Sequence, residues 1–170
     1  MRGLYEVGPL EDGHVRSEFD CGEPSLDRWL VDHSIHAANA STARVFVLCG
    51  KNSKRVGAYH AIAAGSVEYG AASARIRKGA GRHPIPAILI ARLAVDRPIQ
   101  GRGAGSWMLR DALLRAVAAS EVIGARAAIV HAKTVRVRGF YMRHGFEPSP
   151  ADPFNLQLLL SDFLADAGRP

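Results

Sequence analysis

The sequence predicts a mixed α/β (α+β) fold built around one central sheet. Short runs rich in Val, Ile and Leu, which are typical of buried strands, alternate along the chain with segments whose apolar residues recur every three or four positions, as in helices. The 170 residues suffice for one hydrophobic core, and 48% of them are hydrophobic, as in ordinary globular proteins. There is no internal repeat, so we expect a single domain over residues 1–170.

The first half of the chain predicts three strands and one helix. The expected strands are 3–7, 44–49 and 56–64, the last two joined as a hairpin by a polar turn. A helix is expected from Pro24 to about Ala40, because proline suits a first helical turn and the apolar residues that follow share one face. His33 and His36 lie one turn apart on it, but no further ligand-type residues accompany them, so we expect no metal site.

Residues 66–86 show no clear periodicity and are rich in cations. The cations considered as candidates for contact with a nucleic-acid backbone are Arg75, Arg77, Lys78 and Arg82. A solvated loop is the alternative explanation. The formal net charge of +6 and the pI of about 9.8 favour acidic partners such as CoA, a nucleic acid or an acidic protein, without choosing among them.

The second half predicts strands and helices in alternation. The expected elements are strand 87–95, helix 103–119, strand 126–132, helix 134–143 and strand 155–160. Gly145 is expected to end the second helix in the left-handed conformation.

The glycine-rich turn between the strand 87–95 and the helix 103–119 is the most informative stretch. The strand is apolar except for Arg92, and Pro98 helps to end it. Free N–H groups in such a turn, together with the first-turn donors of the helix, form a binding site for a phosphate or pyrophosphate. A tight turn that merely needs glycine is the alternative. The turn lacks the lysine of a Walker loop and the glycine spacing of a dinucleotide fingerprint.

The turn also fits the acetyl-CoA signature Q/R-x-x-G-x-G/A through Gln100, Gly103 and Gly105. With RLAVD before it, and VHA, GFY and HGF after it in order, nearly the whole chain resembles the GNAT superfamily of acyl-CoA-dependent N-acyltransferases. FDCGEPSLDRWL, YHAIAAGSV and the tail HGFEPSPADPFNLQLLL are similar to the GNAT toxins of type II toxin–antitoxin pairs, which acetylate aminoacyl-tRNA and stop translation. The resemblance implies a largely antiparallel sheet splayed at the acetyl-CoA site, with helices on both faces.

The resemblance also implies roles for particular residues. Backbone groups of Leu93, Ala94 and Val95 would pair with the pantetheine arm of acetyl-CoA, and the Val95 amide would polarise the thioester carbonyl. The pyrophosphate would be held by Gln100, Gly101, Arg102, Gly103, Ala104, Gly105 and Ser106. Arg138 and Phe140 would line the same cofactor site. Lys133 and Arg136, where such toxins commonly have acidic or polar residues, would face the tRNA acceptor end or an acidic partner.

Tyr141 matches the family tyrosine near the CoA sulfur and is the expected catalytic residue. A phenol with a pKa of about 10 is a reasonable acid for a thiolate whose thiol has a pKa of about 8.5. A core aromatic beside Phe140 is the alternative. No side chain stands out as a general base, and the α-amino group of an aminoacyl ester, already largely neutral at physiological pH, needs none.

The expected partners are aminoacyl-tRNA, a ribbon-helix-helix antitoxin and a second copy of the chain in a homodimer, all implied by the resemblance. The N-terminus lacks a signal-peptide core and no apolar run reaches membrane-spanning length, so we expect a cytoplasmic protein without membrane contact. Two other functions remain open: acetylation of a small amine, an antibiotic or a protein N-terminus, and a non-catalytic acetyl-CoA-binding or antitoxin-binding module.

Overall fold

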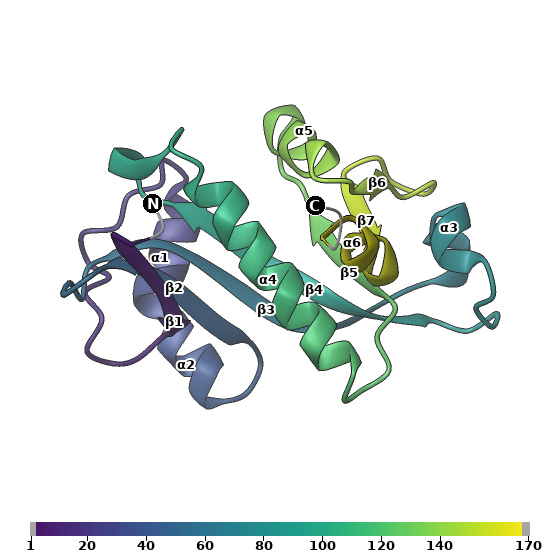
Figure 1. Cartoon of the computed structure of the whole chain (residues 1–170), viewed down its shortest axis with the longest axis horizontal. Helices are drawn as coiled ribbons and strands as arrows, with labels where there is room; N and C mark the ends of the chain where they lie inside the picture. The colour runs from purple at the N-terminus through teal and green to yellow at the C-terminus, as the bar shows by residue number, and fades with distance from the viewer. Residues whose placement is uncertain (1–2, 168–170) are drawn as a thin grey trace. The chain divides into compact units, whose positions relative to one another are not determined.

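The computed structural model describes residues 3–167, which form seven strands, six α-helices and two 3₁₀ turns (Figure 1). The chain divides into two compact units, one made of residues up to 63 with 91–112, the other of 64–90 with residues from 113 onward. Neighbouring strands follow the order β1-β2-β3-β4-β5-β7-β6. The β4–β5 pair is parallel, whereas β1–β2, β2–β3, β5–β7 and β6–β7 are antiparallel. The predicted mixed fold with a largely antiparallel sheet is confirmed.

The first unit holds the N-terminal elements and the glycine-rich turn. Its elements are β1 (Tyr5–Pro9), α1 (Pro24–Asp32), α2 (Ser34–Asn39), β2 (Arg44–Gly50), most of β3 (Val56–Val67), the end of β4 (Ile85–Val95), the 3₁₀ turn η2 (Arg97–Ile99) and the first half of α4 (Ala104–Ser120). β1 continues to Pro9, beyond its predicted end, because β1 is an edge strand and the missing N–H of proline interrupts no ladder there.

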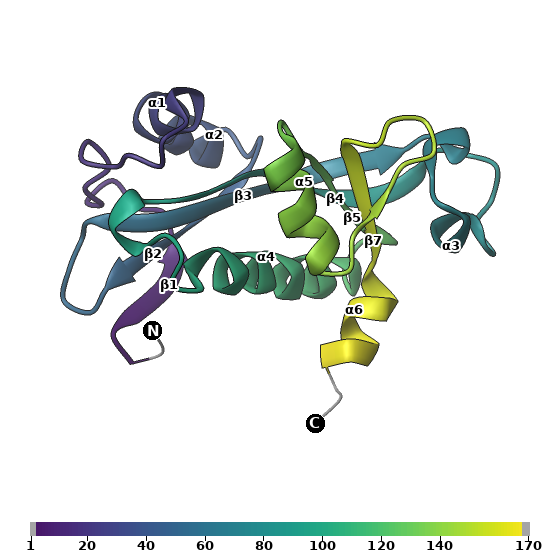
Figure 2. The same ribbon diagram turned by 90° about the horizontal axis from the view of Figure 1, so that it is seen from above.

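Helices cover both faces of the strands in the first unit. Side chains along β2 and β3 alternate between two clusters, as the pleat of a strand requires. One cluster packs against Leu30 of α1 and contains Val45, Val47, Cys49, Tyr59 and Ala61. The other packs against Met108 of α4 and contains Leu48 and Ala58. Figure 2 shows α1 and α2 on one side of these strands and α4 on the other.

The helix predicted from 24 to 40 is in fact two helices. His33, with φ −124°, separates α1 from α2. The buried Ser34 donates its hydroxyl to the Leu30 carbonyl at 2.5 Å. A serine that bonds back to the carbonyl four residues earlier commonly bends a helix, which explains the break that the apolar periodicity does not reveal.

The second unit holds the remaining elements. They are the end of β3, the 3₁₀ turn η1 (Tyr69–Ala71), α3 (Ala74–Arg77), the start of β4, the end of α4, β5 (Ala127–His131), α5 (Val135–Arg143), β6 (Glu147–Pro148), β7 (Asn155–Leu159) and α6 (Leu160–Ala167). Residues 87–89 of β4 pair with 127–129 of β5. Gly145 has φ +88°, which confirms the predicted left-handed residue after α5.

The segment 66–86 is ordered more extensively than its sequence predicts. Ser73 caps α3, and the buried Gln157 of β7 accepts the Ser73 N–H at 2.9 Å and donates to the Ala71 carbonyl at 2.7 Å. Because Gln157 lies more than 80 positions along the chain, no local pattern reveals this support. The helix α6 was also not predicted. Across residues 3–167, no helix has the length and apolar character needed to cross a bilayer.

Candidate functional site

The glycine-rich turn has the backbone geometry of an anion-binding loop. Gly101 and Gly103 have φ +72° and +85°, and Arg102 between them is not in that region. Alternation of this kind turns successive N–H groups to one side and forms a concave donor set. α4 begins directly after Gly103, so its unsatisfied first-turn donors add to that set. A Cβ at either glycine would meet no atom within 4 Å, so glycine is needed for the backbone conformation and not for space.

The exposed side chain of Gln100 links this turn to two neighbouring segments. Its amide nitrogen donates to the Val95 carbonyl at 2.8 Å and to the Cys21 carbonyl at 2.9 Å. These bonds join the end of β4 to the turn that follows it. The amide Nε2 of Gln100 therefore supports the loop, while its backbone remains part of the predicted binding stretch.

A buried carboxylate anchors the same region to the segment before α1. Asp96 is only 2% exposed, its Oδ1 accepts the Asp20 N–H at 3.0 Å, and its Oδ2 lies 2.7 Å from Arg55 Nη2. The backbone of Arg97 donates to the Asp20 carbonyl at 2.9 Å, and its guanidinium lies 2.9 Å from the Asp20 carboxylate. This arginine beside Asp20 lowers the pKa of that carboxyl. The end of β4 is thus held by bonds of both main chain and side chains.

The remaining predicted cofactor residues of the first unit take distinct positions. Leu93 and Val95 pack toward α4, whereas Ala94 packs toward α1. Ala104 is buried as the first residue of α4, and Arg102 and Ser106 are exposed. The side chains of Leu93 and Val95 are thus used in packing, and their backbone is the part that fits the predicted pairing with pantetheine.

Tyr141 lies in α5 of the second unit and is buried among aromatic rings. Its ring makes edge contacts with Phe140 and Phe146 at centroid distances of 5.1 and 5.4 Å. Burial raises the pKa of the phenol above its ordinary value, so the hydroxyl stays protonated at neutral pH. No described residue forms a hydrogen bond with that hydroxyl. The hydroxyl is therefore an unpaired proton donor among the described residues, and it is a weaker acid than an ordinary phenol.

The other predicted residues at and near α5 differ in the contacts that their side chains make. Arg138 donates through Nε to the Pro153 carbonyl at 2.8 Å, and its guanidinium carbon lies 5.9 Å from the centroid of the Phe154 ring. The ring of Phe140 is tilted against that of His144, with 4.6 Å between the ring centroids. Lys133 and Arg136 are exposed at and near the start of α5.

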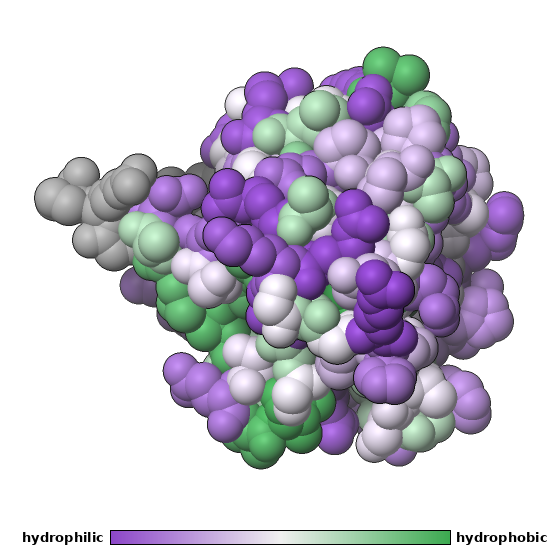
Figure 3. All heavy atoms as spheres, turned by 90° about the vertical axis from the view of Figure 1, so that its right-hand side faces the viewer, coloured by the Kyte–Doolittle hydropathy of each residue, from purple (hydrophilic) through white to green (hydrophobic). Residues whose placement is uncertain are grey.

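The four cations of the segment 74–82 are not equivalent. Arg75 forms a 2.6 Å ion pair with Asp162 of α6 and lies 4.0 Å from Glu147. Arg77 lies over the ring of Tyr69 at 5.8 Å. Lys78 and Arg82 are exposed. Figure 3 faces the side of the molecule on which α3 is drawn, and hydrophilic side chains cover much of it.

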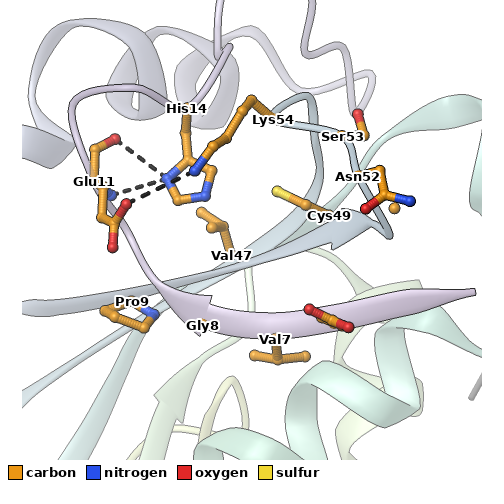
Figure 4. A pocket seen from close by; sticks show the side chains of 12 residues that line it. Val7, Gly8, Pro9, Glu11, His14, Val47, Cys49, Asn52, Ser53 and Lys54 are labelled. Carbon is orange, nitrogen blue, oxygen red and sulfur yellow. Dashed lines mark hydrogen bonds and ion pairs between the residues drawn. The ribbon is translucent and has the colours of Figure 1, made fainter. Parts of the chain in front are cut away.

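A separate pocket opens beside the edge strand β1 of the first unit (Figure 4). Glu11, His14 and Lys54 meet at one side of it, with the Glu11 N–H donating to His14 Nδ1 at 2.9 Å and Lys54 Nζ 3.9 Å from the Glu11 carboxylate. Glu6 lines it as well, so acidic groups balance the lysine and no anion site results. Among the described residues, no group of three or more His, Cys, Asp or Glu side chains is placed to hold a metal ion.

The turn, the strand before it and the helix after it have the backbone geometry of an anion-binding site, and comparison with known proteins identifies the class. The family model for the GNAT acetyltransferase domain matches residues 41–148. The chain therefore belongs to the GNAT acetyltransferase family, and the predicted fold, enzyme class and use of acetyl-CoA are confirmed.

Individual relatives are similar over nearly their whole length. The chain is 43% identical, over 168 residues that cover 99% of both chains, to a tRNA-acetylating toxin of Mycobacterium tuberculosis (strain ATCC 25618 / H37Rv). Its fold is similar to that of AtaT complexed with acetyl-methionyl-tRNAfMet, with a TM-score of 0.89, 24% identity and coverage of 96% of this chain and 99% of that one. It is also similar to a mutant AtaT toxin bound to the C-terminus of the antitoxin AtaR and acetyl-CoA, with a TM-score of 0.82, 23% identity and coverage of 97% and 99%.

Two features of the first unit were not assigned a role from the sequence. The buried Asp96 directly follows β4, and nothing in the local sequence shows that it faces Arg55. Arg92 was noted as the one interruption of an apolar strand, and a charge in such a position is a usable signal that something nearby must stabilise it.

Proposed function

We propose that this protein transfers the acetyl group of acetyl-CoA to the α-amino group of aminoacyl-tRNA and thereby acts as a toxin that blocks translation. The observation that carries the proposal is the 43% identity, over 99% of both chains, with a tRNA-acetylating toxin. The fold shared with AtaT in complex with acetyl-methionyl-tRNAfMet is consistent with it.

Acetyl-CoA would be held mainly by main-chain donors. The N–H groups of 101–106 would bind the diphosphate, and exposed Arg102 would add positive charge. The open space at Gly101 and Gly103 leaves these donors accessible to an anion. The backbone of residues 93–95 would pair with the pantetheine arm, with the Val95 N–H polarising the thioester carbonyl.

The chemistry would be a direct transfer. The neutral amine attacks the carbonyl carbon of the thioester and forms the C–N bond, the C–S bond breaks, and the departing thiolate takes a proton from Tyr141. The nitrogen loses its extra proton to water, and the phenolate is reprotonated from solvent. The phenol is protonated before each transfer, as an ordinary tyrosine also is at neutral pH, and its raised pKa makes it a weaker acid than a tyrosine in water.

The acceptor RNA would contact surface cations. We assign this role to the exposed Lys78, Arg82, Lys133 and Arg136 and to the partly buried Arg77, whose positive charge suits a phosphate backbone. Arg75 would contribute less, because its guanidinium is already paired with Asp162. Hydrogen bonds made by Gln157 and Ser73 hold the segment that carries Arg77 and Lys78 in a defined conformation in the absence of RNA.

The test is incubation of the protein with acetyl-CoA and total charged tRNA, followed by mass spectrometry of the aminoacyl ends. We expect N-acetylated aminoacyl esters in the reaction with the wild-type chain and a strongly reduced yield with Tyr141→Phe. The absence of acetylation on every charged tRNA would disprove the proposal. Acetylation of free amino acids or protein N-termini in its place would indicate the alternative acceptors.

We also propose that the protein is a cytoplasmic homodimer neutralised by a ribbon-helix-helix antitoxin. Support comes from the fold shared with an AtaT toxin bound to the C-terminus of its antitoxin. Light scattering after size-exclusion chromatography is expected to give twice the mass of one chain. Co-expression with a short ribbon-helix-helix protein from the neighbouring reading frame is expected to restore growth and translation, and a monomer or an unprotected host would contradict this proposal.

A further inference from the structure

Arg92 is a charged side chain on a strand that is otherwise apolar. It is half-buried on β4, and it shares a strand face with Ala94, which packs in the cluster beneath α1. Its guanidinium lies over the indole of Trp29 from α1, with the guanidinium carbon 5.3 Å from the ring centroid. Its Nη1 donates to the carbonyl of its own neighbour Ala91 at 2.7 Å.

Among the described residues, no carboxylate lies within ion-pair distance of Arg92. The other well-engaged arginines of the first unit differ in this respect. Arg55 pairs with Glu18 and Asp96, and Arg97 pairs with Asp20. A half-buried cation is costly unless an anion neutralises it, so a site that holds Arg92 without one is suited to an anionic ligand.

The indole beneath the guanidinium is itself held in place by a second aromatic ring. The Trp29 indole lies nearly parallel to the ring of Tyr59, at 5.8 Å between centroids and an interplanar angle of 13°. Tyr59 in turn is fully buried, and its hydroxyl donates to the Leu26 carbonyl at 2.9 Å. A rigid, planar cation on an aromatic support is the kind of surface on which a nucleobase stacks, with the positive charge available to a phosphate.

Arg92 lies at a position on β4 from which it could contact the acceptor close to its reacting amine. Arg92 precedes Val95 by three residues, which corresponds to about 10 Å along a strand. That span is comparable with the distance from an aminoacyl amine, across the ester and the ribose, to the terminal base. We propose that Arg92, supported by Trp29, forms the platform on which the 3′-terminal nucleotide of the acceptor RNA stacks. This inference rests on the function proposed above and specifies how that acceptor is held.

The platform would not discriminate among different tRNAs, because every tRNA ends in the same terminal adenosine and every base has a face that stacks. Removal of the stacked base is expected to weaken binding about tenfold. The side chain lies on the α1 face, away from Leu93 and Val95, so the affinity for acetyl-CoA is expected to stay unchanged in variants of Arg92.

The experiment measures the affinity of the full chain for an RNA microhelix that ends in CCA and carries an amino acid through a stable 3′-amide. A matched microhelix has an abasic terminal nucleotide. With the wild-type chain, we expect the abasic end to weaken binding about tenfold. With Arg92→Met, the intact end should bind about tenfold more weakly, and the abasic end should cause no further loss. Arg92→Lys, which keeps the charge but not the plane, should likewise lose most of its sensitivity to the base.

Arg28→Met is the matched control. Arg28 is an exposed cation on the same helix as Trp29, and it forms no described ion pair. It should retain the tenfold sensitivity to the terminal base. Wild-type protein that binds both ends equally, or Arg92→Met that remains as sensitive as wild type, would overturn the inference. Failure of the proposed function looks different, since the wild-type chain would then acetylate no charged tRNA. Thermal unfolding of each variant checks that it folds. The comparison of the intact and abasic microhelices on the wild-type chain tests the inference even if no variant folds.

Discussion

His60 and Asp111 join the middle of β3 to α4 through one short contact, with 2.7 Å between His60 Nε2 and Asp111 Oδ2. The His60 side chain is fully buried and that of Asp111 is 19% exposed. The ring of Phe46 packs beside the imidazole at 5.2 Å. Because α4 carries the glycine-rich turn at its start, this contact fixes the helix whose N-terminal donors would bind the diphosphate.

Asp111→Ala should lower the free energy of unfolding by about 3 kcal/mol, because it leaves a buried imidazole without its acceptor. Asp111→Asn keeps an acceptor oxygen and should cost about 1 kcal/mol or less. Urea denaturation measures both. Arg110→Ala, an exposed neighbour on the same helix, serves as the control and should change stability by less than about 0.5 kcal/mol. Equal stability of Asp111→Ala and wild type would show that the contact does not hold α4.

Gly103→Ala should weaken acetyl-CoA binding with only a modest effect on folding. The added Cβ meets nothing within 4 Å, but φ +85° strains any other residue by about 1–2 kcal/mol, so the backbone donors shift. Isothermal titration with CoA should show a loss of affinity of at least about tenfold, because the shifted donors no longer converge on the diphosphate. Gly124→Ala also meets open space, lies outside the turn and should bind CoA as wild type does. Matching affinities for the two variants would refute the proposed loop.

Tyr141→Phe should reduce kcat by about 100-fold or more, the usual contribution of a positioned acid. The dissociation constant for acetyl-CoA and the unfolding temperature should stay close to those of the wild type, because no described residue hydrogen bonds to the phenol. Rapid-quench kinetics of thiol release provides the measurement. Undiminished kcat would leave Tyr141 as a core aromatic only.

The pH dependence of kcat/KM should follow the acceptor amine and not the tyrosine. An α-amino group has a pKa of about 7.7–8.0, lowered further by the ester, so the rate should rise toward neutral pH and then level off. Burial raises the pKa of Tyr141 above its ordinary value of about 10, so no fall from phenol ionisation is expected below that pH. The same shift contributes stability that is complete below about pH 10 and declines above it, because only the unfolded chain ionises there. A second ionisation near pH 8 in the rate profile would contradict this assignment.

Cys21 should react slowly with alkylating reagents although it is partly exposed. Burial and the nearby Asp27 carboxylate raise the pKa of this thiol to about 12, so little thiolate exists at pH 8. Cys49 is buried and its thiol pKa is raised as well. Mass spectrometry after iodoacetamide treatment should find both thiols largely unmodified in the folded chain and fully modified in urea. Rapid labelling of Cys21 would instead allow an acetyl-cysteine intermediate in place of direct transfer.

The glycine-rich turn illustrates what could be predicted and why. Its expected role as an anion-binding turn follows from glycines between a strand and a helix, a local property, and the positive φ of Gly101 and Gly103 fits that expectation. The break at His33 was missed because a buried hydroxyl, not a change of periodicity, causes it. The order in residues 69–77 was missed because Gln157 supplies it from a distant strand.

Local sequence was enough to predict the alternation of strands and helices, the family and the stretch that suits a diphosphate, because each depends on residues that are neighbours along the chain. Which charges are neutralised depends instead on contacts made in three dimensions. Asp96 meets Arg55 and Arg75 meets Asp162 across long separations, whereas Arg92 meets an indole and no described carboxylate. The energy of a charge depends on burial and on its nearest partners in space, and neither is encoded in local sequence.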